Sequence, residues 1–183
     1  MELIRLKGVT KEFKRSKILQ DVNISIEEGD IYGIIGQSGS GKTTLLNLIG
    51  GYLRPSEGTV AYFSAVDHQP KELRKHFHKI KRHLGFTHQH YSFYPKLTVK
   101  ENLLHFGRLM GMKKTLLIEN AKSLLRFTGL YDHRNKLSEH LSGGMQRRLD
   151  IACSLIHKPK VLLLDEPTAD LDPLLQEEIL NLL

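Results

Sequence analysis

The sequence has a single cysteine and no long apolar run, and both scarcities exclude classes of protein. Cys153 is the only cysteine among the 183 residues, so the chain cannot form an internal disulfide, and a reducing, cytoplasmic compartment fits. No apolar stretch approaches the roughly eighteen residues that a membrane-spanning helix needs, and residues 1–5 do not resemble a signal peptide. With 40% hydrophobic and 26% charged residues, we expect one soluble globular domain. Any path across a membrane must belong to another chain.

Negative charge is also scarce, and the resulting imbalance is local. The formal net charge is +7, and between Lys71 and His83 six lysines and arginines stand against the single acid Glu72, a surplus of +5. Two interpretations stay open, a solvated basic helix or loop and a contact with anionic lipid headgroups beside a membrane protein. Because most of the surplus lies in this one stretch, we expect no nucleic-acid partner. The histidines of this region match no zinc spacing and have no accompanying cysteine, so they predict no metal site.

A glycine-rich segment follows an apolar run near residue 36. Residues 36–43 read Gly-Gln-Ser-Gly-Ser-Gly-Lys-Thr, which matches the phosphate-binding pattern of Gly, four free positions, Gly-Lys and Ser or Thr. The apolar run 31–35 predicts a strand before this loop, and residues 42–50 predict a helix after it. Glycines let backbone amides turn toward phosphate oxygens, and the helix start adds partial positive charge. A glycine-rich turn without a ligand is the alternative, which the strand and helix on either side disfavour.

Nine residues of this segment are candidates for nucleotide binding. Lys42 would reach the β- and γ-phosphates, and the Thr43 hydroxyl would bind magnesium. The full set is Gly36, Gln37, Ser38, Gly39, Ser40, Gly41, Lys42, Thr43 and Thr44.

An acidic pair closes a second apolar run. Residues 161–164 read Val-Leu-Leu-Leu, which predicts a strand buried on both faces, and Asp165 and Glu166 follow it. Asp165 is placed to hold magnesium through water or through Thr43, and Glu166 to orient or deprotonate an attacking water. An acidic pair alone is as compatible with turn residues as with catalysts. Its place downstream of the phosphate loop favours catalysis.

A third motif opens a helical pattern. Residues 141–148 read Leu-Ser-Gly-Gly-Met-Gln-Arg-Arg. Ser142, Gly143 and Gly144 would expose a hydroxyl and backbone amides at the start of a helix, which is an anion site. One chain has no need for two γ-phosphate sites, so this motif predicts contact with the ATP that another subunit holds. A Ser-Gly-Gly helix cap without a ligand is the alternative.

The three motifs together resemble those of the nucleotide-binding domain of an ABC transporter, and the likeness runs from Leu3 to the end of the chain. The resemblance implies that Gln89 senses magnesium and contacts the membrane partner, and that Phe13 lies against adenine. It also implies that segment 169–172, with Asp172 as a nucleotide contact, connects two active sites. Glu166 and Gln89 are then the catalytic residues. The implied magnesium ligands are Thr43, Gln89 and Asp165.

The chain departs from that family in two respects. Met145 stands where the family most often has glutamine, and Gly-Gly-Met with the following arginines resembles exporters of the daunorubicin-resistance type and their lipid-exporting relatives. The Gln-Ser-Gly-Ser-Gly form of the phosphate loop is less typical of that branch, which more often has Asn-Gly-Ala. The family also has a histidine that contacts the γ-phosphate on a later strand. Because the chain stops at Leu183, we expect a domain that is incomplete at its carboxyl end.

The fold that this resemblance implies is α/β, a P-loop NTPase core with a mainly parallel sheet, an antiparallel β subdomain and an inserted α-helical subdomain. We assign the core to about 1–90 and 155–183 and the helical subdomain to about 91–154.

Local patterns predict the individual elements. Alternation over 3–13 and 18–26 predicts strands of an antiparallel sheet, and further strands are expected at 58–63 and 84–87. Helical periodicity runs from about 98 to 140. Tyr91, Phe93 and Tyr94 form an aromatic loop between the two regions. We expect core packing to use one or two of these rings. The family resemblance implies that such a surface receives a helix from the membrane subunit, and an exposed aromatic patch here would support that.

The motifs lead to one preferred function. We predict an ATP-binding and ATP-hydrolysing subunit of an ABC transporter, with export favoured, that works with a transmembrane permease subunit and with a second ABC ATPase subunit. Two ATP molecules and their magnesium ions would lie head to tail between the two ATPase subunits, at the cytoplasmic face of the cell membrane. Two alternatives stay open: a soluble ABC ATPase that acts on nucleic acid or ribosomes, and a nucleotide-binding fragment without turnover.

Overall fold

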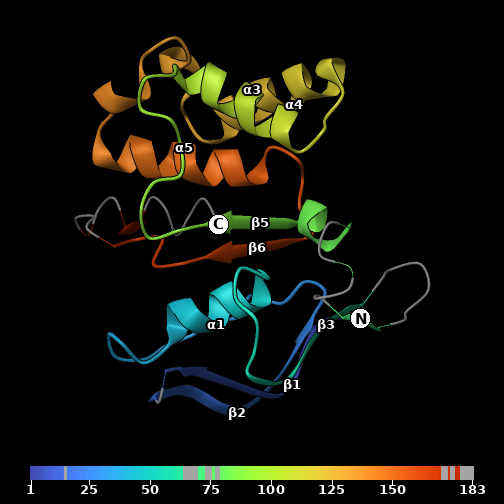
Figure 1. Cartoon of the computed structure of the whole chain (residues 1–183). Coiled ribbons are helices and arrows are strands. Elements are labelled where there is room, and N and C mark those ends of the chain that lie inside the picture. Colours follow the sequence, from blue (N-terminus) through green and yellow to red (C-terminus); the bar gives the residue numbers. More distant parts are fainter. Residues whose placement is uncertain are drawn as a thin grey trace. The chain divides into compact units, whose positions relative to one another are not determined.

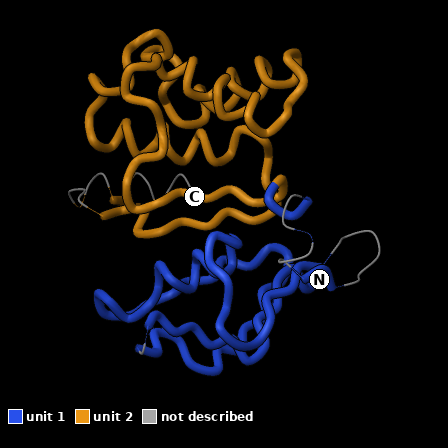
Figure 2. The backbone as a smooth tube through the Cα atoms, in the orientation of Figure 1, with its two compact units in different colours: residues 1–81 blue, residues 82–183 orange. Residues whose placement is uncertain are grey.

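The computed structural model describes residues 1–14, 16–63, 70–72, 76, 79–169, 173 and 176–177. The chain divides into two compact units, residues 1–81 and residues 82–183 (Figure 2). Within the described ranges, every helix is too short or too polar to span a membrane. The predicted division at about residues 90 and 155 into a core and a helical subdomain stays a prediction.

The first unit is built on an antiparallel sheet with the strand order β2-β1-β3-β4 (Figure 1). The strands are β1 (Glu2–Phe13), β2 (Ser16–Glu27), β3 (Glu57–Phe63) and β4 (Pro70–Glu72). Ile4, Leu6 and Val9 of β1 are at most 2% exposed and lie in the core of the unit. The antiparallel pairing of β1 with β2 confirms the prediction made from the alternation over 3–13 and 18–26.

Helix α1 (Lys42–Ile49) starts directly after the glycine-rich loop and is capped by Gly50, as the sequence predicts. Its buried side chains are Leu45, Leu46, Leu48 and Ile49. The buried hydroxyl of Tyr62 on β3 donates a hydrogen bond to the carbonyl of Ile49 at 2.5 Å. This bond holds the carboxyl end of α1 on the sheet.

The strand predicted at 31–35 is not formed, which corrects the prediction made from its apolar pattern. No described strand pairs with this segment, and the side chains of Ile31 and Ile35 are 97% and 99% exposed. A strand requires a neighbour that takes up its backbone N–H and C=O groups. The apolar pattern describes the side chains of the segment but does not supply that neighbour.

The second unit contains a parallel pair of strands, β5 (Leu84–Thr87) and β6 (Val161–Leu164), in which Leu84 pairs with Val161 and Thr87 with Leu164. Helix α5 (Gly143–Leu155) packs against β5. A Cβ atom at Gly85 would lie 2.6 Å from the carbonyl oxygen of Ser154, so glycine permits this close approach. The predicted short strand at 84–87 is confirmed.

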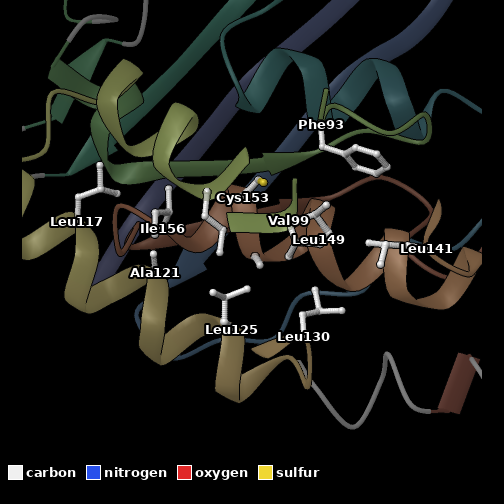
Figure 3. Packing of buried hydrophobic residues seen from close by; sticks show 12 residues of the cluster. Phe93, Val99, Leu117, Ala121, Leu125, Leu130, Leu141, Leu149, Cys153 and Ile156 are labelled. Atoms are coloured by element: carbon white, nitrogen blue, oxygen red, sulfur yellow. The ribbon is translucent and has the colours of Figure 1, made fainter. Parts of the chain in front are cut away.

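Three helices supply the core of the second unit. They are α3 (Val99–Leu109), α4 (Lys114–Phe127) and α5. The 3₁₀ turns η2 (Tyr131–His133) and η3 (Ser138–His140) lie between α4 and α5, and η1 (Lys81–His83) precedes β5. Their buried faces meet in one apolar cluster (Figure 3). It contains Phe93, Val99, Leu103, Leu117, Ala121, Leu125, Leu130, Leu141, Leu149, Ala152, Cys153 and Ile156.

Candidate active site

The glycine-rich loop presents an open helix start. Gly41 caps α1 in the left-handed conformation (φ 97°), and no side chain caps the first turn. Gly39 is also left-handed (φ 79°), which turns the loop through a geometry that other residues rarely adopt. The amide of Ser40 donates to the carbonyl of Gln37 at 3.2 Å. Because its N-cap residue is a glycine without a capping side chain, this helix start is suited to an anion.

The ammonium group of Lys42 is folded back over this loop. Its Nζ donates to the carbonyl oxygens of Gly36 and Gln37 at 2.9 and 3.0 Å. A Cβ at Gly36 would lie 2.7 Å from the Ser40 hydroxyl, so the loop is tightly closed at this point. The lysine charge is therefore held inside the loop, where phosphate oxygens can replace the two carbonyls as its partners.

Two further predicted nucleotide contacts of the first unit, Thr43 and Thr44, directly follow this loop. Thr43 and Thr44 occupy the first turn of α1, with the Thr43 side chain exposed. The loop packs on β2, because a Cβ at Gly41 would lie 3.0–3.1 Å from the side chains of Ile18 and Leu19.

Phe13 is placed at the end of β1, paired with Ser16 at the start of β2. Its side chain is 43% exposed. The Lys11 ammonium lies 4.8 Å from the ring centroid, so one face of the ring already has a cation against it. A base would stack on the other face or displace the lysine.

The acidic pair lies in the second unit, at the carboxyl end of β6. Asp165 is 2% exposed, and its amide donates to the carbonyl of Thr87 at 2.9 Å, which continues the β5–β6 pairing by one step. Burial lowers the pKa of the neighbouring His88, and the negative charge of Asp165 opposes that shift only in part. In β6 itself only Leu163 is buried and the other three residues are half-buried, so the prediction of a strand buried on both faces is correct for one residue.

Gln89 and Glu166 meet, although 77 positions separate them. The Gln89 Nε2 donates to Glu166 Oε2 at 3.1 Å. Glu166 has a φ of 49°, which is uncommon for a residue with a side chain and marks local backbone strain. The parallel pairing of β5 with β6 explains the meeting, since the two residues lie just past the same ends of adjacent strands.

The third motif forms the start of α5. Ser142 is the N-cap residue, and its Oγ accepts a hydrogen bond from the Met145 amide at 3.4 Å. Gly143 is exposed, Gly144 is buried, and no acidic residue stands in the first turn. The helix start is thus suited to an anion, but Ser142 also acts as an ordinary cap, as the alternative reading expects.

The structure also reveals two residues that the sequence reasoning missed. Arg147 and Asp150 of α5 are each 2% exposed and lie against the loop that carries Gln89. The sequence contains a signal for this pair, because Arg147 and Asp150 have opposite charges and stand at positions i and i+3 of a segment whose apolar residues predict a helix. Of the aromatic loop, Phe93 is in the core, whereas Tyr91 and Tyr94 are 40% and 48% exposed.

The predicted site residues therefore fall into two sets. The glycine-rich loop, α1 and Phe13 belong to the first unit, and Gln89, the acidic pair and the third motif belong to the second. Asp172 lies outside the described residues. Among those described, no three His, Cys, Asp or Glu side chains group as metal ligands would.

Comparison with known proteins decides the family. A family model described as ABC transporter matches residues 19–169. The chain belongs to the ABC transporter family. It is an ATP-binding domain of that family, as its motifs predict.

Relatives of this ABC domain include subunits of several transport systems. The spermidine/putrescine import ATP-binding protein PotA of Fusobacterium nucleatum is 38% identical over 178 residues, which are 97% of this chain and 45% of PotA. The lipoprotein-releasing system ATP-binding protein LolD of Rickettsia felis is 37% identical over 182 residues, which are 97% of this chain and 79% of LolD. The ABC domain thus spans less than half the length of PotA.

A solved structure confirms the predicted fold class. The ATP-binding cassette MJ0796, in a dimeric post-hydrolysis state bound to ADP and Pi, matches with a TM-score of 0.79 and 34% identity. The match covers 98% of this chain and 81% of that chain. The ABC domain described above therefore has the P-loop NTPase fold of such cassettes.

Proposed function

We propose that this ABC domain binds and hydrolyses ATP and thereby drives a separate transmembrane permease subunit. The observation that carries the proposal is the glycine-rich loop, an uncapped helix start with the Lys42 ammonium held inside it. Its donors match the triphosphate of a nucleotide, which needs several N–H groups and a positive charge on one side. The family and the names of the relatives support the same activity.

We assign hydrolysis to the residues just past the ends of β5 and β6. The Glu166 carboxylate would accept a proton from the attacking water, and the Gln89 amide bonded to it would keep the carboxylate oriented. Lys42 would exchange its two carbonyl partners for β- and γ-phosphate oxygens. The Lys42 ammonium would then stabilise the negative charge that develops on the phosphate oxygens during phosphoryl transfer.

The oxygen donors of Thr43, Asp165 and Gln89 suit magnesium, which prefers hydroxyl, carboxylate and amide oxygens. We assign the ion to these residues on the chemistry of the donors. When bound, magnesium would neutralise phosphate charge.

A second ATPase subunit completes each site in this proposal. The start of α5, with Ser142, Gly143 and Gly144, would contact the γ-phosphate of the ATP held by that subunit. The shared phosphate charge would favour closure of the dimer, and hydrolysis would remove it. Among the relatives, the dimeric MJ0796 cassette supports this arrangement.

For the direction of transport and the location of the domain, the supporting features are weaker than those for ATP binding. The Gly-Gly-Met sequence and the two arginines after it favour export, while PotA is named for import. We place the domain at the cytoplasmic face of the membrane, with the loop after Gln89 toward the permease. The exposed rings of Tyr91 and Tyr94 in that loop support a docking surface there.

ATP binding and hydrolysis by the chain and two variants test the proposal. Lys42→Ala should weaken ATP binding about 10- to 150-fold, the range expected when a charged hydrogen-bond partner is lost. Glu166→Gln should keep ATP binding, lower kcat about a hundredfold or more and trap the dimer. Lys96→Ala is the matched control, because Lys96 is exposed and pairs with Glu139 in the second unit.

The outcomes separate the candidate functions. Unchanged ATP affinity in Lys42→Ala would refute the nucleotide assignment of the loop. Binding that depends on Lys42 without any hydrolysis by the wild-type chain would instead support a nucleotide-binding module without turnover. Hydrolysis stimulated by nucleic acid or ribosomes, and not by a membrane protein, would support the soluble ABC ATPase.

A further inference from the structure

Two buried charges on α5 bind the backbone of the loop after β5. The Arg147 guanidinium donates from Nη1 to the His88 carbonyl and from Nη2 to the Gln89 carbonyl, both at 3.0 Å. The Asp150 Oδ1 accepts the amide hydrogen of Ser92 at 2.8 Å. Three backbone groups within residues 88–92 are therefore held by one helix.

A fourth contact joins the same loop to the start of that helix. The Tyr91 ring lies under the Arg147 guanidinium, 5.0 Å from ring centroid to Cζ, and the Tyr91 hydroxyl donates to the Gly143 carbonyl at 3.4 Å. The loop thus contacts α5 along its first two turns, from Gly143 to Asp150. Residues of this stretch include the predicted γ-phosphate contacts of the partner's nucleotide.

The two charges are poorly paired with each other. Arg147 Nη1 and Asp150 Oδ2 are 3.7 Å apart, and within the described structure Arg147 Nε and Asp150 Oδ2 have no hydrogen-bond partner. Burying such a pair gains little stability compared with apolar residues of similar size. The hydrogen bonds of 2.8–3.0 Å that both side chains make go to the loop backbone. The pair therefore holds the loop in place.

Gln89 is the loop residue that this arrangement affects. Its carbonyl and that of His88 are bound to Arg147, while its side chain reaches the Glu166 carboxylate at 3.1 Å. Whether the Gln89 side-chain amide contacts Glu166 depends on where the Gln89 backbone is held. A shift of α5 would move that backbone, and with it the Gln89 amide.

We propose that Arg147 and Asp150 form a positioning pair that fixes Gln89 against Glu166 and makes this contact depend on the position of α5. The proposal rests on the proposed roles of Gln89 and Glu166 in ATP hydrolysis. It couples the start of α5, which faces the partner's ATP, to the catalytic carboxylate of the chain's own site. Neither side chain is a catalytic residue, because both act through the loop backbone.

Arg147→Lys tests the pair with the least disturbance. Lysine keeps a positive charge beside Asp150 but cannot donate to two carbonyls with the fixed spacing of a guanidinium. We expect kcat for ATP hydrolysis to fall about 10- to 100-fold, because misplacement of catalytic groups by about 1 Å has effects of this size. KM for ATP should change less than about threefold, since the phosphate-binding loop belongs to the other unit.

Arg134→Lys is the matched control. The Arg134 guanidinium also donates to a backbone carbonyl, that of Tyr131 at 2.8 Å, and lies 4.5 Å over the Tyr131 ring. Arg134 therefore makes the same kinds of contact as Arg147, but with a residue far from the Gln89 loop in the sequence. A general loss of packing would affect both variants, whereas the proposal predicts a fall in kcat for Arg147→Lys alone.

Amide hydrogen exchange supplies a readout that does not require turnover. The Ser92 amide should exchange about as fast in Asp150→Ala as an unbonded loop amide, and should stay protected in Asp150→Asn, which keeps the acceptor oxygen. Arg147→Lys should speed exchange across residues 88–92, while the α5 amides keep their protection. Unchanged exchange in this segment in both Arg147→Lys and Asp150→Ala would overturn the proposal.

A double-mutant cycle with Gln89→Ala separates the proposal from the function on which it rests. If the pair acts through Gln89, Arg147→Lys should lower kcat no further once Gln89 is alanine. If the two substitutions lower kcat by factors that multiply in the double variant, the positioning role is refuted, while the catalytic role of Gln89 is unaffected. An unchanged kcat in Gln89→Ala alone would show that the proposed role of Gln89 is wrong, and the positioning role would fall with it.

Discussion

The buried carboxyl group of Asp150 should make the stability of the chain fall as the pH rises from 4 to 7. Asp150 is 2% exposed, and burial raises its pKa from 3.8 to about 6, although the Ser92 amide and the Arg147 charge oppose the shift. The folded state therefore holds this proton more tightly than the unfolded state. The resulting stabilisation is complete below about pH 3.8 and is lost as the pH rises through about 6.

The size of the effect follows from the two pKa values. Each tenfold change in proton affinity corresponds to about 1.4 kcal/mol, so a pKa of about 6 against 3.8 gives about 3 kcal/mol in total. About 2 kcal/mol of this should appear between pH 4.5 and pH 7.5. Asp150→Asn removes the titration but keeps an oxygen that can accept the Ser92 amide hydrogen.

Urea denaturation of the wild type and of Asp150→Asn at a series of pH values would measure this effect. Far-UV circular dichroism is suitable, because α3, α4 and α5 of the second unit contain most of the described helical residues. Both proteins carry the same histidines, whose titration cancels in the difference between the two unfolding free energies. That difference should move by about 2 kcal/mol in favour of the variant as the pH rises from 4.5 to 7.5.

Two results would refute this reasoning. A difference that does not change with pH would mean that burial does not outweigh the Ser92 hydrogen bond and the Arg147 charge, so that the pKa of Asp150 is not raised in the folded state. A change of the opposite sign would mean that attraction to Arg147 outweighs burial, and that the ion pair stabilises the fold at neutral pH. With the expected sign, the ionised carboxylate lowers stability at neutral pH, which agrees with a role in positioning the loop.

Two further predictions concern the first unit. Gly58→Ala should lower the unfolding free energy by on the order of 3 kcal/mol, because Gly58 has a φ of 79° and its added Cβ would lie 2.2 Å from the carbonyl oxygen of Gly8. In chemical denaturation it should cost more than Gly29→Ala, where φ is 88° but no atom lies within 4 Å; equal losses would contradict the steric argument. Phe13→Ala should weaken ATP binding about tenfold through the loss of base stacking but leave tripolyphosphate binding unchanged. Equal weakening of both ligands, or of neither, in calorimetric titrations would remove Phe13 from the adenine site, while Lys11→Ala tests the cation over its ring.

Local sequence determined the elements that depend on local chemistry. Alternating apolar residues predicted β1 and β2, which pair as expected. The glycines at 39 and 41 have the left-handed backbone that a phosphate-binding turn uses. Ser142 caps the start of α5, as its place before two glycines predicts. In each case the decisive interaction lies within a few residues of the chain, where spacing and residue type are sufficient.

Tertiary structure decided what depends on partners distant in the sequence. The run 31–35 is apolar enough for a strand, yet a strand needs a neighbour's hydrogen-bonding groups, and no described strand provides them. Phe93 is buried whereas Tyr94, one position later, is half exposed, because the helices that pack against the loop come from residues further along the chain. Only the parallel pairing of β5 with β6 brings Gln89 to Glu166.

The charged residues of α5 show the same division most clearly. The sequence by itself identified the family motifs, and the family model confirms the family. It also predicted which residues contact the nucleotide, because a phosphate requires particular donors at particular spacings. It could not show that Arg147 binds the carbonyls of His88 and Gln89, about 58 positions away. Such a contact follows from how α5 lies on β5, and the packing of a helix on a strand is set by the whole core of the unit.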